Sequence, residues 1–244
     1  MRKKDRLAQI RAILEQNGQV NVLTLSSELS VSGVTIRSDL ETLEQEGFAV
    51  RTHGGAVLRE RDSSSALDPF SDGIRKVAQL AAARIEDHSW IFLGSGGTCL
   101  AVAAALAEGE RSVNVLTNSI PIADLAARSS SLNIQLTGGS VHRSRYPFVY
   151  GDRTLTALEG VTVDQAFIGV AGIDLNFGLS VTNEVERGIF SRVHAAAKEA
   201  LIVADHTKFD KRTFMKIADL FQVTGIITDG DVPAAYLPFC IEPR

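Results

Sequence analysis

Cysteine, histidine and aromatic residues are scarce in this chain of 244 residues, which contains two cysteines, five histidines and 6% aromatic residues. Cys99 and Cys240 lack the spacing of a metal site, and they need no disulfide in a reducing compartment. No apolar run is long enough to span a bilayer, and the first residues lead into an amphipathic pattern rather than the apolar core of a signal peptide. We therefore expect a cytoplasmic protein without a metal site, a cofactor or membrane contact.

A strong excess of positive charge is also absent. The chain has 25 lysines and arginines against 29 aspartates and glutamates, a net charge of −4, and its first 60 residues contain 8 of each sign. Basic residues nevertheless form two local groups, namely Arg2, Lys3, Lys4 and Arg6, and Arg51, His53, Arg59 and Arg61. Both groups could neutralise DNA phosphates, whereas Glu41 and Glu44 are expected at the far end of a helix.

The first 56 residues have the pattern of three short helices followed by a β-ribbon. Leu7, Ile10 and Leu14 lie on one stripe of a first helix, and residues 22–29 form a second, shorter stripe. The remaining segments are a third helix at residues 32–47 and a glycine-ended ribbon at residues 48–56. This order predicts a winged helix-turn-helix, which holds one helix in the DNA major groove.

The third predicted helix would carry the residues that read DNA. Ile36, Leu40 and Leu43 recur at i, i+4 and i+7 and must face the core, so Val34 points outward, where it can pack on a thymine methyl group. Ser32 is a natural N-cap for this helix. The predicted DNA-contacting residues are Ser32, Gly33, Val34, Thr35, Arg37, Ser38, Arg51 and His53. The alternative is a packed α/β subdomain that contacts no DNA.

Residues 60–72 become polar and lose the hydrophobic period, which indicates a linker between a first domain at residues 1–59 and a second at residues 73–244. Beyond the linker, apolar runs alternate with helical patterns. The predicted strands are residues 90–93, 113–117, 132–137, 166–170, 200–204 and 225–228, and the predicted helices are residues 98–106, 120–127 and 184–198. This alternation predicts an α/β fold with a doubly wound, mostly parallel sheet.

Small and polar residues follow most of these strands, at the edge of the sheet where α/β proteins bind ligands. Residues 94–98 form a glycine-rich turn that opens a helix and offers backbone N–H groups to an anion. Lys208 can pair with a phosphate. The predicted effector-binding residues are Ser95, Gly96, Gly97, Thr98, Asn118, Ser119, Gly138, Gly139, Gly172 and Lys208. Each turn alone can equally be a tight turn or a helix cap.

Segments in both domains resemble the DeoR family of bacterial transcriptional regulators. They are residues 34–40, 43–47 and 51–56 in the first domain, and residues 92–98, 116–119, 137–139, 164–169 and 205–209 in the second. The resemblance implies a winged helix-turn-helix followed by a sensor domain similar to sugar-phosphate isomerases. It also implies a homo-oligomeric repressor, a dimer or tetramer, of a carbohydrate-utilisation operon. Such a repressor binds double-stranded operator DNA and responds to a phosphorylated sugar or sugar alcohol.

Two other functions remain open at this point. One is an active phosphosugar isomerase or deaminase whose general base would be Asp174, Glu184 or Glu186, although each of these can also cap a turn or a helix. The other is a domain that serves only for assembly. The DeoR family usually has aspartate where this chain has Gly94, and the loss of that acidic group argues against turnover. We predict a binding protein without catalytic residues.

Overall fold

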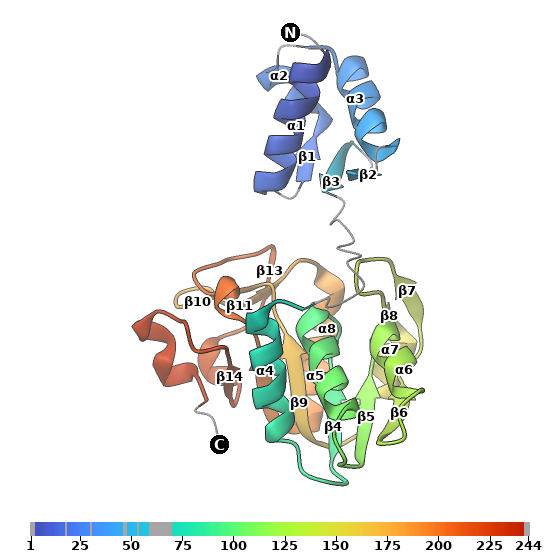
Figure 1. Ribbon diagram of the computed structural model, residues 1–244, viewed down its shortest axis with the longest axis vertical. Helices are drawn as coiled ribbons and strands as arrows, with labels where there is room; N and C mark the ends of the chain where they lie inside the picture. The colour runs from blue at the N-terminus through green and yellow to red at the C-terminus, as the bar shows by residue number, and fades with distance from the viewer. Residues whose placement is uncertain are drawn as a thin grey trace. The chain divides into compact units, whose positions relative to one another are not determined.

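The computed structural model describes residues 3–17, 19–29, 31–45, 48–52, 54–58 and 70–241, and its contacts divide the chain into two units, residues 1–69 and 70–244 (Figure 1). His53, a predicted DNA contact, lies outside the described residues, and so do Arg2, Arg59, Arg61 and residues 60–69 of the predicted linker. Among the described residues, no helix is both long enough and apolar enough to cross a membrane.

The first unit consists of three helices and a small antiparallel sheet. Its elements are α1 (Lys3–Asn17), β1 (Gln19–Asn21), α2 (Val22–Glu28), α3 (Gly33–Gln45), β2 (Ala49–Thr52) and β3 (Gly55–Leu58), with strand order β1-β3-β2. The apolar stripes of the helices meet in one core, and Ile36, Leu40 and Leu43 are all buried there. The predicted helices and ribbon are confirmed. The sequence did not predict β1, because three residues are too few to show alternation.

A buried ion pair joins α1 to α3. The guanidinium of Arg6 donates two hydrogen bonds to the carboxylate of Asp39, and the bond from Nη2 to Oδ1 measures 3.1 Å. Arg6 is 8% exposed and Asp39 is 1% exposed. A bidentate pair of this kind fixes both side chains. The expectation that Arg6 would neutralise DNA phosphates was therefore wrong, since its guanidinium is committed to Asp39.

The second unit is built on a six-stranded parallel sheet. In spatial order its strands are β14 (Gly225–Ile227), β12 (Ala197–Val203), β9 (Val163–Gly169), β4 (Trp90–Leu93), β5 (Val113–Thr117) and β6 (Leu132–Leu136). Helices α4 (Asp72–Ala83), α5 (Gly97–Ala107) and α6 (Ile120–Ala126) pack on one face, and α8 (Glu184–Ala196) packs on the other (Figure 1). This arrangement confirms the predicted doubly wound parallel fold.

Several short elements between the main strands were not predicted. They are β7 (Ser140–His142), β8 (Phe148–Tyr150), α7 (Asp152–Ala157), β10 (Gly172–Asp174), β11 (Gly178–Val181) and β13 (Met215–Ala218). Strands β7 and β8 form a hairpin, and β10, β11 and β13 form a second antiparallel sheet. The predicted helix at residues 184–198 ends at Ala196, where β12 begins earlier than predicted. Since the strands of the main sheet are parallel, the turns after β4, β5, β6, β9 and β12 all lie at one edge, here called the carboxyl edge.

Candidate nucleic-acid interface and effector site

The first turns of α3 present the predicted reading face to solvent. The predicted residues of this helix run from the cap through two turns: Ser32, Gly33, Val34, Thr35, Arg37 and Ser38. The side chain of Val34 is 73% exposed, and Arg37 and Ser38 are exposed as well. Ser32 caps the helix, because its Oγ accepts a hydrogen bond from the backbone N–H of Thr35 at 3.2 Å. An apolar group and polar groups thus point outward from one turn, as contact with base edges and phosphates requires.

The ribbon of β2 and β3 holds Arg51 beside two acidic side chains of α3. Nη1 of Arg51 lies 3.8 Å from Oε1 of Glu41, and the backbone N–H of Arg51 donates to Oε1 of Glu44 at 3.0 Å. The two glutamates lie in the C-terminal half of α3, as the sequence suggested, and this part of the helix lies next to the ribbon. Because Arg51 and Glu41 are both exposed, their ion pair is weak, and it leaves the guanidinium accessible to solvent.

The glycine-rich turn after β4 leads directly into α5. Gly96 has a φ of 114°, a conformation that favours glycine, and it precedes the helix without a side-chain cap. Uncapped N–H groups at the start of a helix attract anions. The hydroxyl of Tyr146, in the turn between β7 and β8, lies against Gly97, since a Cβ at Gly97 would be 2.7 Å from that oxygen. The hairpin therefore packs over the glycine-rich turn.

A cavity of about 40 Å³ lies between the carboxyl edge of the sheet and α8. It is lined by Phe92, Gly94, Ser95, Asn118, Ile168, Gly169, Val181, Glu186, Ile189, Phe190, Val193 and Ile217. Two of the predicted effector-binding residues, Ser95 and Asn118, are among them. Of the lining residues from β9, β11, α8 and β13, the sequence pointed only to Glu186, as a possible general base, because the apolar positions of these elements resemble ordinary core.

The other predicted effector residues do not line this cavity. They are Gly96, Gly97, Thr98, Ser119, Gly138, Gly139, Gly172 and Lys208. The structure gives some of them a packing role: Ser119 caps α6, a Cβ at Gly139 would lie 2.3 Å from the carbonyl oxygen of Tyr150, and a Cβ at Gly172 would lie 2.5 Å from that of Lys211. A part in ligand binding stays a prediction for all eight.

Two polar side chains in the cavity wall are unusually placed. Asn118 is 2% exposed, and its Oδ1 is buried without a hydrogen-bond partner among the described residues, while Nδ2 donates weakly to the carbonyl of Val149 at 3.5 Å. Glu186 lies in the first turn of α8, whose cap is Asn183. Burial raises the pKa of the Glu186 carboxyl above its ordinary value, although hydrogen bonds with Thr182 and Asn183 oppose the shift. Both side chains are therefore acceptors that a ligand can satisfy.

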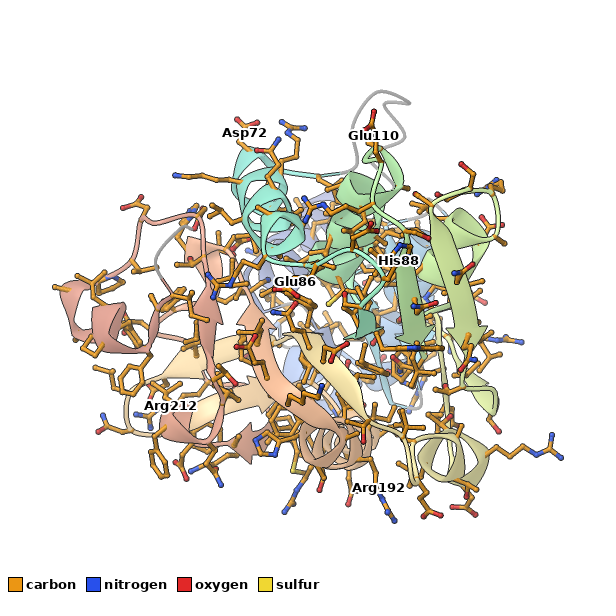
Figure 2. The ribbon with its side chains drawn as sticks, turned by 90° about the horizontal axis from the view of Figure 1, so that it is seen from below. Asp72, Glu86, His88, Glu110, Arg192 and Arg212 are labelled. Atoms are coloured by element: carbon orange, nitrogen blue, oxygen red, sulfur yellow. The ribbon has the colours of Figure 1, made fainter. Side chains whose placement is uncertain are left out.

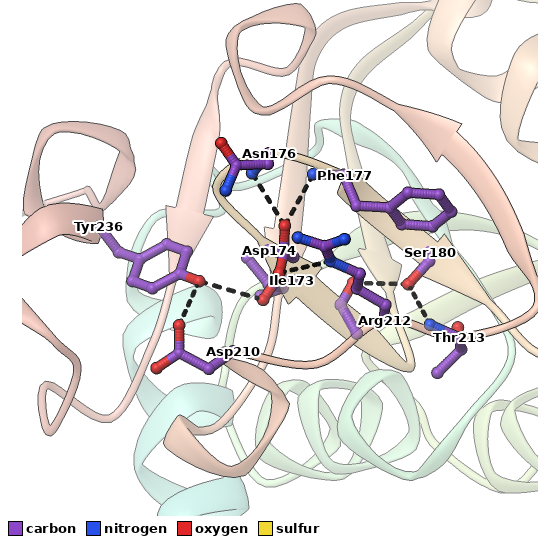
Figure 3. A network of polar contacts seen from close by, with 10 residues as sticks. Ile173, Asp174, Asn176, Phe177, Ser180, Asp210, Arg212, Thr213 and Tyr236 are labelled. Carbon is purple, nitrogen blue, oxygen red and sulfur yellow. Dashed lines mark hydrogen bonds and ion pairs between the residues drawn. The ribbon is translucent and has the colours of Figure 1, made fainter.

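The other carboxylates considered as a general base have structural roles. Oδ1 of Asp174 accepts the backbone N–H groups of Asn176 and Phe177 at 2.8 and 2.7 Å, and Oδ2 pairs with Nε of Arg212 at 2.8 Å (Figure 3). The hydrogen bond from Arg212 is the main cause that lowers the pKa of Asp174 to about 2. Glu184 is exposed on α8 and does not line the cavity. Asp174 is thus a poor base, and of the three carboxylates only Glu186 reaches the cavity.

Nucleophilic and metal chemistry find no support in the part of the chain that the structure describes. Burial raises the pKa of the Cys99 thiol to about 12, so it is not a thiolate at neutral pH. No group of three or more His, Cys, Asp or Glu side chains within the described ranges could hold a metal ion. Glu86 and His88 precede β4 and lie at the amino edge of the sheet, the side opposite the cavity (Figure 2).

The chain matches two family models, the DeoR-like helix-turn-helix domain over residues 6–62 and the DeoR C terminal sensor domain over residues 71–230. It is 33% identical to a putative aga operon transcriptional repressor of Escherichia coli O157:H7, over 94% of this chain and 87% of that protein. The HTH-type transcriptional repressor GlcR of Bacillus subtilis strain 168 is 31% identical, over 94% and 89% of the two chains. The glycerol-3-phosphate regulon repressor of Escherichia coli K12 is 28% identical, over 97% and 95%.

Among solved structures, a ribose 5-phosphate isomerase A of Methanocaldococcus jannaschii is 19% identical, with a TM-score of 0.40 over 57% of this chain and 54% of the isomerase. The relatives similar over nearly the whole chain are transcriptional regulators and not enzymes, which confirms the prediction of a regulator. The two matched models together cover both units of the structure. This chain belongs to the DeoR family of helix-turn-helix transcriptional regulators.

Proposed function

We propose that the chain represses a carbohydrate-utilisation operon and that a phosphorylated sugar or sugar alcohol, bound in the second unit, changes its affinity for operator DNA. The family membership supports the DNA-binding repressor. The names of the relatives, which refer to the aga operon and the glycerol-3-phosphate regulon, support the carbohydrate class of target. We further propose that the protein acts in the cytoplasm as a dimer or tetramer, because paired helix-turn-helix domains bind paired half-sites.

The observation that carries the DNA-binding part is the exposed start of α3. A valine that is 73% exposed is unfavourable in water, and base contact in the major groove would cover it. Arg37, about one helical turn after Val34 in the same exposed segment, would contact a phosphate or a guanine edge. We place Arg51 on the adjacent backbone, where a phosphate would take the position of Glu41.

The effector part rests on the carboxyl edge of the sheet. The N-terminus of α5 behind Gly96 would hold the phosphate through backbone N–H groups, and Ser95 and Thr98 would add hydroxyl donors. The sugar end would then approach the cavity that Ser95 shares with Asn118. Lys208 follows the strand β12, and we retain it as a candidate for the phosphate because its strand ends at the same edge.

Fluorescence anisotropy of the full-length protein on its own upstream DNA tests this proposal. The measurement is made at physiological salt with competitor DNA, with and without a panel of sugar phosphates and sugar-alcohol phosphates. We expect specific binding that at least one compound weakens. Arg37→Ala should weaken operator binding on the order of 10-fold, whereas Arg192→Ala, which removes an exposed arginine of α8, should leave it unchanged. Isomerisation of a sugar phosphate at an enzyme-like rate would overturn the proposal.

A further inference from the structure

The cavity at the carboxyl edge offers a ligand hydrogen-bond acceptors from two separate elements. The carboxylate of Glu186 comes from the first turn of α8, and the unpartnered Oδ1 of Asn118 comes from the end of β5. None of the described residues that line the cavity is a lysine, an arginine or a histidine. The two acceptors therefore favour a ligand group that donates hydrogen bonds, and a fully ionised phosphate, which has only acceptors, does not suit this part of the cavity.

We infer that the effector carries a protonated amine, which Glu186 and Oδ1 of Asn118 hold, so that the effector class is an amino-sugar phosphate. The inference rests on the proposed function, since it assumes that a sugar phosphate binds at this edge. A hydroxyl group has one hydrogen to donate, so it would satisfy only one of the two acceptors, and it would leave the charge of the partly buried carboxylate unbalanced beside the charge of the phosphate. An ammonium group satisfies the acceptors and balances the charge.

The position of the cavity agrees with this division of the ligand. Ser95, in the glycine-rich turn, is part of its wall, so an amine held by Glu186 and Asn118 leaves the phosphate free to approach the N-terminus of α5. The pKa of Glu186, which burial raises, also points to a carboxylate without a cation nearby.

Isothermal titration of the full-length protein tests the inference with matched pairs of compounds at pH 6.5, where a sugar amine is protonated. The pairs are glucosamine 6-phosphate with glucose 6-phosphate, and galactosamine 6-phosphate with galactose 6-phosphate. We expect one amino compound to bind at least 10-fold more tightly than its hydroxyl counterpart, because a hydrogen bond between charged groups is among the stronger ones. Glu186→Gln should reduce that preference to less than threefold.

Glu184→Gln is the matched control, because it removes the same charge from the same turn of α8 at an exposed position outside the cavity. It should keep the full preference, and thermal unfolding should show that both variants fold. Equal binding of the amino and hydroxyl compounds by the unmodified protein, or a preference that survives in Glu186→Gln, would overturn the inference and leave the proposed function intact. If no sugar phosphate binds or alters DNA affinity, the proposed effector function itself fails, and the inference fails with it.

Discussion

Replacement of Asp39 by alanine should open the first unit by leaving the Arg6 guanidinium buried without its partner. The pair lies between α1 and α3, with Arg6 8% exposed and Asp39 1% exposed, so water cannot take over the lost hydrogen bonds. Removal of one member of a buried pair lowers the free energy of unfolding by about 3–5 kcal/mol. This destabilisation should be largest in α3, because Asp39 lies at the centre of that helix.

Hydrogen exchange of the full-length protein, followed by mass spectrometry, measures this effect locally. Each 1.4 kcal/mol changes an opening equilibrium tenfold, so peptides from α3 should exchange faster by about 100-fold or more in Asp39→Ala. Peptides from α5, in the second unit, should exchange at an unchanged rate and serve as the internal control. Operator binding should weaken in parallel, since the reading face belongs to the same helix.

A second variant separates the loss of the pair from the burial of an unpaired charge. Arg6→Met with Asp39→Leu replaces both groups by apolar side chains of similar length, and it should recover most of the lost protection. An α3 exchange rate in Asp39→Ala within about fivefold of the original would refute the reasoning. It would mean that solvent reaches Arg6 and that the pair contributes no more than a surface ion pair does.

Two further predictions concern the second unit. The hydrogen bond from His206 to Asp229, 2.6 Å between Nδ1 and Oδ2, raises the pKa of His206, so Asp229→Asn should lower it toward the ordinary value near 6.5 in an NMR titration. Because the pKa of His206 is raised in the folded state, the stabilisation from this pair is complete below the ordinary histidine pKa near 6.5 while Asp229 is ionised, and it fades as the pH rises through the folded pKa. A difference in stability between the original protein and Asp229→Asn that grows over this rise in pH would contradict this. Gly97→Ala would place a Cβ 2.7 Å from the Tyr146 hydroxyl, so the half-buried ring must move aside, and the variant should lower the unfolding temperature by an amount equivalent to at most about 1 kcal/mol. In a Tyr146→Ala background, Gly97→Ala should change the unfolding temperature much less. An equal decrease in the unfolding temperature with and without the Tyr146 side chain would show that the two residues are not in contact.

The sequence predicted the parts of the fold that depend on local periodicity. Ile36, Leu40 and Leu43 are buried because a helix returns to the same face every three or four residues, and this spacing is visible without a structure. The strands of the main sheet were predicted for a similar reason, since each is a short apolar run between turns. The short strands β1, β7 and β10 have only three residues, which is too few for such a pattern.

The sequence could not predict contacts between residues far apart in the chain. Arg6 and Asp39 are 33 positions apart, and nothing in the local charge pattern distinguishes Arg6 from the exposed Lys3. The cavity also depends on contacts between distant parts of the chain. Its lining residues come from β4, β5, β9, β11, α8 and β13, and only the packing of α8 against the sheet brings them together. Residues at strand ends were good candidates by topology, but only Ser95 and Asn118 of the predicted set line the cavity.

The structure brings Gly94 and Glu186 together, although they are far apart in the sequence. The absence of an acidic side chain at Gly94 argued against turnover, because the turn after β4 has no carboxylate there. The structure places Gly94 and Glu186 in the wall of the same cavity, so a carboxylate is supplied after all, from a different element. A Cβ at Gly94 would lie 3.4 Å from the carbonyl oxygen of Phe167 and 3.8 Å from Sγ of Cys99. These are ordinary van der Waals distances, so the backbone at Gly94 does not by itself exclude a side chain, and the carboxylate of this cavity comes from α8 instead.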